Sequence, residues 1–422
     1  MVEWELPRWE TSQSTFIHNI RLPVHGWFRF PAGFSAEWVE SVIESHKATL
    51  DGLAFLDPFA GVGTSVLAAE QAGICAYGVE AQPFIQRIAE AKLLWETSTK
   101  EFHDMAQAVR NCAKTSWESV GIYPDLIHKC FSDEAIHDLD RLRCAWEWLN
   151  DSSPAAKLTW LALVGILRAC SSAGTAPWQY VLPNKTKARV LAPYEAFTLQ
   201  VRKMLSDMML WQALETRREA TIFLGDARSC TSIPNNSVGL VVTSPPYANN
   251  YDYADATRLE MTFLGEIRGW GGLHARARKH LIRSCSQHAS IEKLSLAPLL
   301  GTLAGSTFIE EISTACDRLA EERLNHGGKK DYYLMVAAYF SDMREVWSAL
   351  RRVCAQDSKV CFVVGDSAPY GIHVPTDRWL GELAVQAGFN SYTFEKIRDR
   401  NVKWKNRKHQ VPLHEGFLWV VG

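Results

Sequence analysis

The sequence predicts an α/β fold: a doubly wound, mostly parallel sheet with one large helical insertion and a second, smaller insertion. An apolar strand at 53–56 runs through a glycine-containing turn into a helix, which is the repeating unit of such sheets. Residues 84–220 are almost entirely helical in pattern, so they separate the second strand from the third. Further short apolar runs predict strands at 75–79, 221–224, 238–242, 360–364, 392–397 and 416–421.

Composition excludes several classes of protein. The 422 residues, 47% of them hydrophobic, allow one large α/β domain with insertions or two to three smaller domains. No apolar run reaches the roughly 18 residues of a membrane span, and the first residues lack a signal-peptide pattern. We therefore expect a soluble, cytoplasmic protein with no membrane partner.

Cysteine spacing and charge narrow the chemistry further. The ten cysteines occur singly, without a C-x-x-C pair, which predicts reduced thiols and neither a zinc ribbon nor a disulfide framework. The spacing of His274, His280, Cys285 and His288 fits no zinc pattern, so we expect no metal. The formal net charge is −2, so any surface for a polyanion must be local.

The turn after the first strand has the features of a nucleotide cradle. The strand ends in Asp57, Gly61 and Gly63 permit close backbone approach, and the unpaired amides of the following helix face a ligand. The next strand ends in Glu80, which is placed to accept hydrogen bonds from two ribose hydroxyls. The alternatives are a plain strand-to-helix turn and a solvated glutamate. Before this unit, Ser35 is the predicted N-cap of a helix that follows a loop at 25–34.

The region 84–220 is predicted to contain helices at 86–95, 136–149, 158–169 and 199–214, with a loop at 171–193. It is large enough to be a subdomain, and its composition assigns it no chemistry. The basic residues of the loop (Lys185, Lys187 and Arg189) are as consistent with a solvated loop as with a binding surface.

The strongest chemical signal is Ser244-Pro245-Pro246-Tyr247, which follows the apolar strand at 238–242. Two prolines stop the strand and lock the backbone, so the Pro245 carbonyl points in a fixed direction. A fixed carbonyl, a hydroxyl and an aromatic ring suit the capture of a flat base that carries an exocyclic amine. The alternative is a structural Pro-Pro turn at a sheet edge.

Candidate nucleic-acid contacts lie after this turn. A polar, aromatic loop is expected to cover the pocket, and the insertion at 265–330 combines basic residues with Trp270. A basic stretch at 398–409 is a second candidate, although solvated surfaces explain both runs equally simply. The residues predicted to contact DNA are Asn249, Asn250, Tyr251, Arg276, Arg278, Lys279, Arg283, Lys403, Lys405 and Arg407.

These motifs resemble, in this order, those of the S-adenosylmethionine-dependent DNA amino-methyltransferases. Residues 30–34 look like the first cofactor-flanking motif, 57–64 like the glycine motif, Asp226 like the acid that reads the adenine amine, and 244–247 like the catalytic tetrapeptide. The resemblance implies a class I methyltransferase sheet and S-adenosyl-L-methionine as cofactor. The cofactor-binding residues that it implies are Phe30, Pro31, Phe34, Asp57, Pro58, Phe59, Ala60, Gly61, Gly63, Thr64, Glu80, Asp226 and Ala227.

The resemblance also implies a mechanism and partners. Ser244 and the Pro245 carbonyl would accept hydrogen bonds from the amine of a base flipped out of double-stranded DNA, and Tyr247 would stack on that base. Serine before Pro-Pro leans towards the N4 amine of cytosine; N6 of adenine, an RNA substrate, a small aromatic amine and a non-catalytic nucleic-acid-binding protein remain alternatives. A cognate restriction endonuclease or other defence-system component is a candidate partner.

The same reasoning divides the chain into three parts. Residues 1–100 would carry the first cofactor motifs, 101–220 a helical insertion and candidate DNA-recognition subdomain, and 221–422 the rest of the core with its insertion at 265–330. Which insertion reads DNA sequence stays open.

Overall fold

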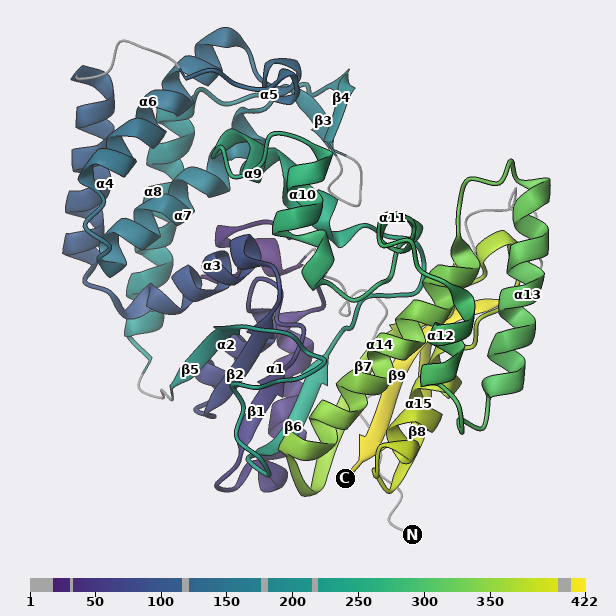
Figure 1. Ribbon diagram of the computed structural model, residues 1–422. Helices are drawn as coiled ribbons and strands as arrows, with labels where there is room; N and C mark the ends of the chain where they lie inside the picture. The colour runs from purple at the N-terminus through teal and green to yellow at the C-terminus, as the bar shows by residue number, and fades with distance from the viewer. Residues whose placement is uncertain (1–17, 31–32, 116–120, 176–180, 215–218, 401–410) are drawn as a thin grey trace.

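The computed structural model describes residues 18–30, 33–115, 121–175, 181–214, 219–400 and 411–422. Its centre is a seven-stranded sheet in the order β5-β2-β1-β6-β7-β9-β8 (Figure 1). Strand β9 runs in the opposite direction to the other six strands of this sheet. The predicted mostly parallel α/β fold is therefore confirmed. The strands are β1 (Ala54–Asp57), β2 (Ala76–Glu80), β5 (Ala220–Leu224), β6 (Val238–Thr243), β7 (Cys354–Gly365), β8 (Ser391–Arg400) and β9 (Leu413–Val421).

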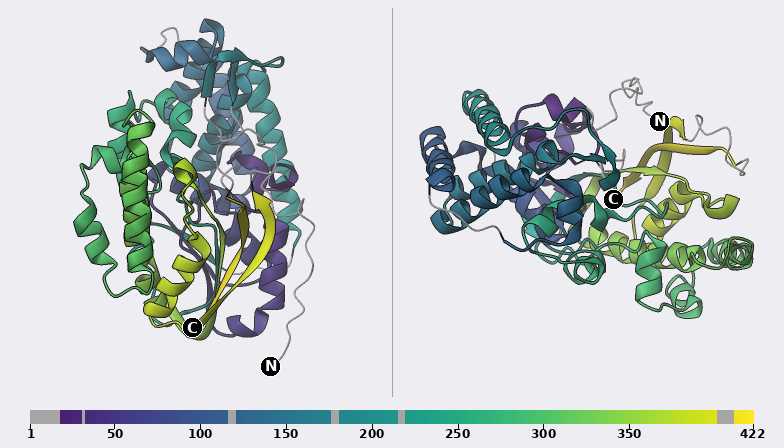
Figure 2. Two further views of the ribbon diagram at one scale, coloured as in Figure 1. Left: turned by 90° about the vertical axis from the view of Figure 1, so that its right-hand side faces the viewer. Right: turned by 90° about the horizontal axis from the view of Figure 1, so that it is seen from above.

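Alternating side chains bury both faces of this sheet. On β7, Cys361 and Val363 pack with α1 (Ala36–Ser45) and α2 (Thr64–Gln71), whereas Val360 and Phe362 pack with α14 (Tyr332–Val353) and α15 (Thr376–Gln386). The side view in Figure 2 shows the sheet between α1 and the green helices α13 and α14. Burial on both faces explains why the central strands read as continuous apolar runs.

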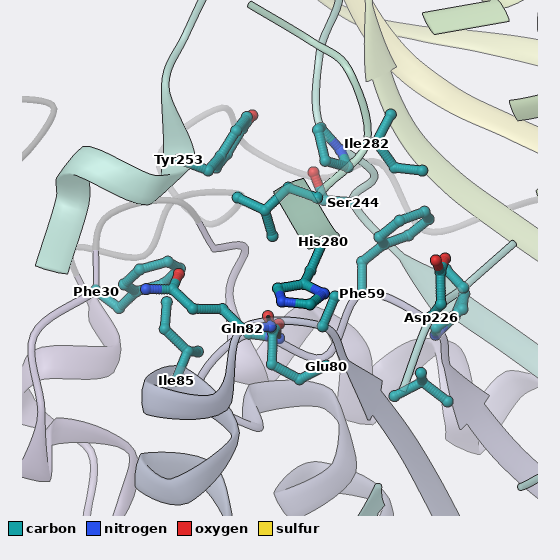
Figure 3. Close-up of a pocket in the computed structure, with 17 residues that line it drawn as sticks. Phe30, Phe59, Glu80, Gln82, Ile85, Asp226, Ser244, Tyr253, His280 and Ile282 are labelled. Carbon is teal, nitrogen blue, oxygen red and sulfur yellow. Dashed lines mark hydrogen bonds between the residues drawn. The ribbon is translucent and has the colours of Figure 1, made fainter. Parts of the chain in front are cut away.

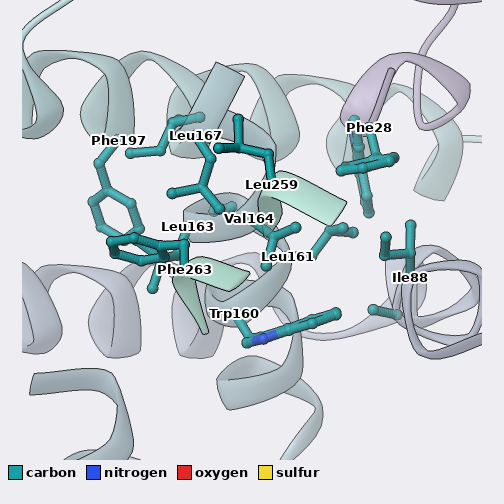
Figure 4. Packing of buried hydrophobic residues seen from close by; sticks show 14 of the residues in the cluster. Phe28, Ile88, Trp160, Leu161, Leu163, Val164, Leu167, Phe197, Leu259 and Phe263 are labelled. Atoms are coloured by element: carbon teal, nitrogen blue, oxygen red, sulfur yellow. The ribbon is translucent and has the colours of Figure 1, made fainter. Parts of the chain in front are cut away.

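A helical layer lies beside the sheet and forms the large insertion between β2 and β5 (Figure 1). Its core is built around α7 (Pro154–Cys170), where Leu161, Val164 and their neighbours pack against Phe197 of α8 (Figure 4). The same core includes Phe28 from before the insertion and Phe263 from after it. Packing therefore crosses the borders at residues 100 and 220, and the three-part division of the chain stays a proposal.

Most predicted helices occur where the periodicity placed them, and Ser35 caps α1 by accepting a hydrogen bond from the Trp38 amide at 3.4 Å. One prediction was incomplete, because the predicted loop at 171–193 contains a two-stranded hairpin, β3 (Ala173–Thr175) with β4 (Val181–Thr186). The second insertion contains several short helices and one of 17 residues, Ile309–Asn325. The remaining helices are α3 (Pro83–Lys92), α4 (Thr99–Thr115), α5 (Asp125–Cys130), α6 (Asp133–Leu149), α8 (Pro193–Gln212), α9 (Arg258–Phe263), α10 (Trp270–Arg276), α11 (Ser286–Ile291), α12 (Leu296–Thr302) and α13 (Ile309–Asn325), with 3₁₀ turns η5 (Tyr253–Thr257) and η6 (Arg278–His280) among the connections.

Within the described ranges, no helix has both the length and the apolar character that crossing a bilayer requires.

Candidate active site

A cavity opens at the carboxyl edge of the sheet, where ligands bind in open α/β folds. It encloses about 630 Å³ including its open mouth. The turns that follow β1, β2, β5 and β6 all contribute to it, so the segments that sequence motifs singled out do converge (Figure 3). The lining residues are Phe30, Pro58, Phe59, Gly61, Val79, Glu80, Ala81, Gln82, Ile85, Asp226, Ala227, Ser244, Pro246, Tyr253, His280, Leu281 and Ile282.

Asp57 organises the turn after β1 from beneath the cavity. The buried carboxylate accepts hydrogen bonds from the Phe59 amide at 2.9 Å, from the Thr243 hydroxyl at 2.5 Å and from the Ser65 hydroxyl. Burial raises the pKa of Asp57 to about 6, although these three donors oppose the rise. By joining β1, α2 and β6, Asp57 fixes the backbone of the turn.

Glycines and small residues complete this turn. Gly61 and Gly63 have φ of 52° and 82°, a region that glycine adopts without strain, and α2 begins directly after Gly63. Ala60 and Thr64 are buried. Pro58 and Phe59 contribute their side chains to its lining.

Glu80 presents a buried carboxylate to the cavity. One oxygen accepts from the Gly61 amide at 3.0 Å and the other from the Gln82 amide at 2.8 Å. Each carboxylate oxygen has two lone pairs, so both keep capacity for a ligand hydroxyl. Burial is the main cause that raises the pKa of Glu80 to about 7, and the charge of Asp57 adds to it.

Asp226 follows β5 and is held by its neighbour Arg228. The guanidinium donates to both carboxylate oxygens, at 3.0 and 2.7 Å, and the Arg228 amide donates at 2.9 Å. The Asp226 side chain is 40% exposed and, with Ala227, lines the cavity. The exposed carboxylate is thus oriented before any ligand arrives, and it can accept from an amine.

The turn after β6 contributes two residues to the lining of the same cavity. Ser244 and Pro246 line it, and the Ser244 hydroxyl donates to the Val363 carbonyl at 3.4 Å, a long and weak hydrogen bond. Pro245 is buried. The Tyr247 amide donates to the Tyr253 hydroxyl at 3.3 Å, and the Arg400 guanidinium lies 5.2 Å from the centroid of the Tyr247 ring.

The structure separates two residues of the N-terminal motif that were predicted to bind the cofactor. Phe30 lines the cavity, but Phe34 does not: its ring packs edge-on against Trp38, with centroids 5.6 Å apart, in the core beneath α1. The carbonyl of Phe34 also accepts from the buried Asn19 amide, which fixes the turn. Pro31 lies outside the described residues.

Three residues predicted to contact DNA instead contact partners inside the protein. Arg278 is 2% exposed and pairs with Asp252, and Arg283 pairs with Asp342. Asn250 accepts hydrogen bonds from the amide and hydroxyl of Ser286, so its side chain holds the loop to α11. The two guanidinium groups are paired with carboxylates inside the protein, and the side-chain oxygen of Asn250 is used by Ser286.

The other predicted contacts differ in where they lie. Asn249, Arg276 and Lys279 are exposed, and Tyr251 is half-buried against Tyr253, with ring centroids 4.5 Å apart. The predictions for Lys403, Lys405 and Arg407 fall outside the described residues.

Comparison with known proteins places this site in context. No protein-family model matches the chain. The Type II methyltransferase M.BsoBI of Geobacillus stearothermophilus is 23% identical over 451 residues, covering 95% of this chain and 86% of that protein. The Type II methyltransferase M.AvaI, from a Nostoc strain and from Anabaena variabilis, is 25% identical over 433 residues, covering 95% of this chain and 85% of its own length. The chain is homologous to Type II methyltransferases.

The homology extends through both insertions, since it covers nearly the whole chain. Sequence reasoning missed part of the cavity that this methyltransferase homologue contains. Gln82 and Ile85 directly follow Glu80, so their position after the second strand was a usable signal. Tyr253, His280, Leu281 and Ile282 come from the loop and the second insertion, where no local pattern marks them as lining residues.

Proposed function

We propose that this protein is an S-adenosylmethionine-dependent DNA methyltransferase that modifies the exocyclic amine of a flipped base. The observation that carries the proposal is convergence: three acidic turns and the Ser-Pro-Pro-Tyr turn meet at one cavity at the carboxyl edge of the sheet. Homology to Type II methyltransferases over 95% of the chain supports the same reaction class.

The residues around the cavity fit the proposed cofactor. Glu80 keeps acceptor capacity for two ribose hydroxyls, and burial is the main cause that raises the pKa of its carboxyl. Asp226 offers an oriented acceptor for the adenine amine, while Phe30 and Ile85 provide apolar surface. When bound, the cofactor supplies an electrophilic methyl group on a sulfonium centre.

The Ser-Pro-Pro-Tyr turn would prepare the nucleophile. An exocyclic amine attacks poorly while its lone pair is delocalised into the ring of the base. The Ser244 oxygen and the Pro245 carbonyl, accepting the two amine hydrogens, favour a pyramidal nitrogen aimed at the methyl group. Tyr247 holds the base by stacking, so the rate enhancement comes from position and aligned dipoles.

Exposed basic residues near the mouth of the cavity support a DNA substrate. Arg276 and Lys279 are exposed, and Trp270 is 53% exposed with the Arg258 guanidinium 4.3 Å from its ring centroid. Helix α10 packs against η5 and η6, which carry the cavity residues Tyr253 and His280. Phosphates and unstacked bases are the chemistry that such a surface recognises.

The finer proposal is that N4 of cytosine is the target atom, because the family that these motifs resemble leans towards cytosine where serine stands before Pro-Pro, as Ser244 does here. Such an enzyme would protect DNA from a cognate restriction endonuclease in the same host. Adenine N6 is the second candidate.

Incubation with duplex DNA and labelled cofactor, followed by nucleoside mass spectrometry, tests the reaction and the base together. N4-methylcytosine supports the full proposal, N6-methyladenine overturns the choice of base, and transfer only to RNA or none at all overturns the function. Ser244→Ala is expected to bind cofactor normally but to lower turnover about 10- to 1000-fold, the scale of losing one aligned group at a reacting centre.

A further inference from the structure

A six-residue segment of the second insertion, residues 278–283, is held by a buried ion pair at each end. At its start, Arg278 donates to the Asp252 carboxylate at 2.5 Å, and the two residues are only 2% and 6% exposed. Asp252 also accepts from the Ala254 amide at 3.2 Å, so it caps η5 at the same time. The pair thereby joins the segment to the loop that follows the catalytic turn.

The other end is fixed to helix α14. The Arg283 amide donates to the Asp342 carboxylate at 2.9 Å, and its guanidinium donates to both oxygens at 2.5 to 3.1 Å. Asp342 is 1% exposed and also accepts from Arg228 at 3.3 Å. Since Arg228 holds Asp226, one buried carboxylate connects the end of the segment to an acid of the cavity.

The residues between the two pairs face the cavity. His280, Leu281 and Ile282 all line it, although η6 is a single 3₁₀ turn and the segment has no strand partner. Figure 3 shows the His280 ring projecting into the cavity on the side of Glu80 and Gln82. The position of this wall therefore depends on its two end anchors.

We propose that residues 278–283 form a pinned wall of the cofactor cavity, in which His280 contacts the adenosine part of the ligand and Asp252 and Asp342 are positioning residues. The inference rests on the proposed function and deepens it. A neutral imidazole offers one donor and one acceptor, which matches a ribose hydroxyl or an adenine ring edge.

The anchors supply order that the segment lacks by itself. Fixing each residue in one backbone conformation costs conformational entropy, and within residues 278–283 no described sheet or long helix offsets this cost. Breaking either pair leaves a buried charge without a partner, so the freed end is expected to move towards water. A displaced wall would withdraw His280 from the ligand while the turns after β1 and β2 keep their own hydrogen bonds.

Calorimetry of the full chain with S-adenosylhomocysteine tests the contact. His280→Ala is expected to weaken binding about 10-fold, the scale of one lost hydrogen bond. Gln287→Ala, an exposed change four residues beyond the segment, is the matched control and should bind like wild type. Equal affinity of wild type and His280→Ala overturns the proposed contact.

Steady-state kinetics tests the positioning role. Asp342→Asn is expected to raise KM for the cofactor about 10-fold, with little change in kcat at saturating cofactor or in KM for DNA. Glu345→Gln, an exposed change on the same helix, is the control. A fall in kcat with unchanged cofactor KM would show that Asp342 does not act through this wall. Should Asp342→Asn fail to fold, Asp252→Asn and the His280→Ala calorimetry decide the matter.

The outcomes separate the two proposals. Wild-type protein that binds S-adenosylhomocysteine but methylates no DNA overturns the proposed function and leaves the cavity wall standing. Wild-type protein that methylates DNA while His280→Ala binds normally overturns the wall alone. Absence of binding by wild type overturns both.

Discussion

The floor and the wall of the cavity are stabilised in different ways. In the floor, the carboxylates of Asp57, Glu80 and Asp226 each accept an amide hydrogen from a residue two positions further along the chain. In the wall, Arg278 and Arg283 pair with carboxylates that are 26 and 59 residues away. One side of the site is made by local turns and the other by tertiary structure.

This difference indicates which parts of the cavity are sensitive to changes elsewhere in the structure. Each carboxylate of the floor has one donor that is a neighbour in sequence, although Asp57 also accepts from Thr243 and Arg228 also contacts Asp342. The wall requires α14 to be packed in place before Arg283 finds Asp342. We therefore expect changes in α14 to reach the ligand through the wall and, by way of Arg228, through Asp226, whereas the turns after β1 and β2 keep their own hydrogen bonds.

The largest expected effect is a loss of stability when the carboxylate that anchors the wall is removed. Asp342→Ala leaves Arg283 and Arg228 without their shared buried carboxylate and should lower the free energy of unfolding by about 3 kcal/mol. Urea denaturation measures this, with Glu345→Ala on the same helix as the control. If the free energy of unfolding falls by less than about 1 kcal/mol, Asp342 contributes no more than an exposed ion pair does, which would contradict the proposed difference between floor and wall.

A change in the floor should affect binding more than stability. Glu80→Ala removes an acceptor for two ribose hydroxyls and should weaken S-adenosylmethionine binding by about 2 kcal/mol, or tens of fold. Calorimetry measures the affinity, and circular dichroism checks that the fold is retained. Unchanged binding by a folded variant would contradict the assignment of Glu80.

The pH dependence of binding sharpens the description of the floor. Burial raises the pKa of Glu80 to about 7, so its contribution to the stability of the ligand-free protein is present below its ordinary value of 4.5 and is lost as pH rises through 7. The carboxylate is the better acceptor for ribose hydroxyls. S-adenosylhomocysteine should therefore raise the melting temperature more at pH 8 than at pH 6, and Glu80→Ala should reduce that difference. An equal shift at both pH values in wild type would contradict this.

The smallest expected effect is on the salt dependence of DNA affinity, which distinguishes exposed from internally paired basic residues. Replacing Arg276 and Lys279 together by alanine should make the slope of log affinity for DNA against log salt shallower by about two. Both side chains are exposed, whereas Arg278 is already paired inside the wall. Filter binding over a salt series measures the slope, and an unchanged slope would mean that these residues are only a solvated face.

The sequence predicted the floor because its signals are local. Asp57, Glu80 and Asp226 each end or follow an apolar strand, and β strands of this kind bring their ends to one edge. Helix α14 also carries a local signal, because its apolar residues recur regularly over Tyr332–Val353. Similarly, the rigidity of two prolines after β6 was visible in the residues themselves.

The wall could not be predicted, because a sequence shows a charge without its partner. Arg278 and Arg283 stand in a basic run that looks suited to phosphates, and only the fold reveals that Asp252 and Asp342 already neutralise them. The position of Phe34 could not be predicted for the same reason. Its apolar character is evident from the sequence, but whether the ring lies in the core or in the cavity depends on its contacts with Trp38 and the sheet.

The strand order at one edge of the sheet has a consequence for protein synthesis. Strand β8 is paired only with β9, which is translated after it and inserts between β7 and β8. Until β9 has been synthesised, the backbone amides and carbonyls of β8 lack their strand partner, and β7 has an unpaired edge. Unpaired edges of this kind are where nascent chains associate wrongly, so the interval before β9 arrives is when this protein is most prone to aggregate and most in need of a chaperone.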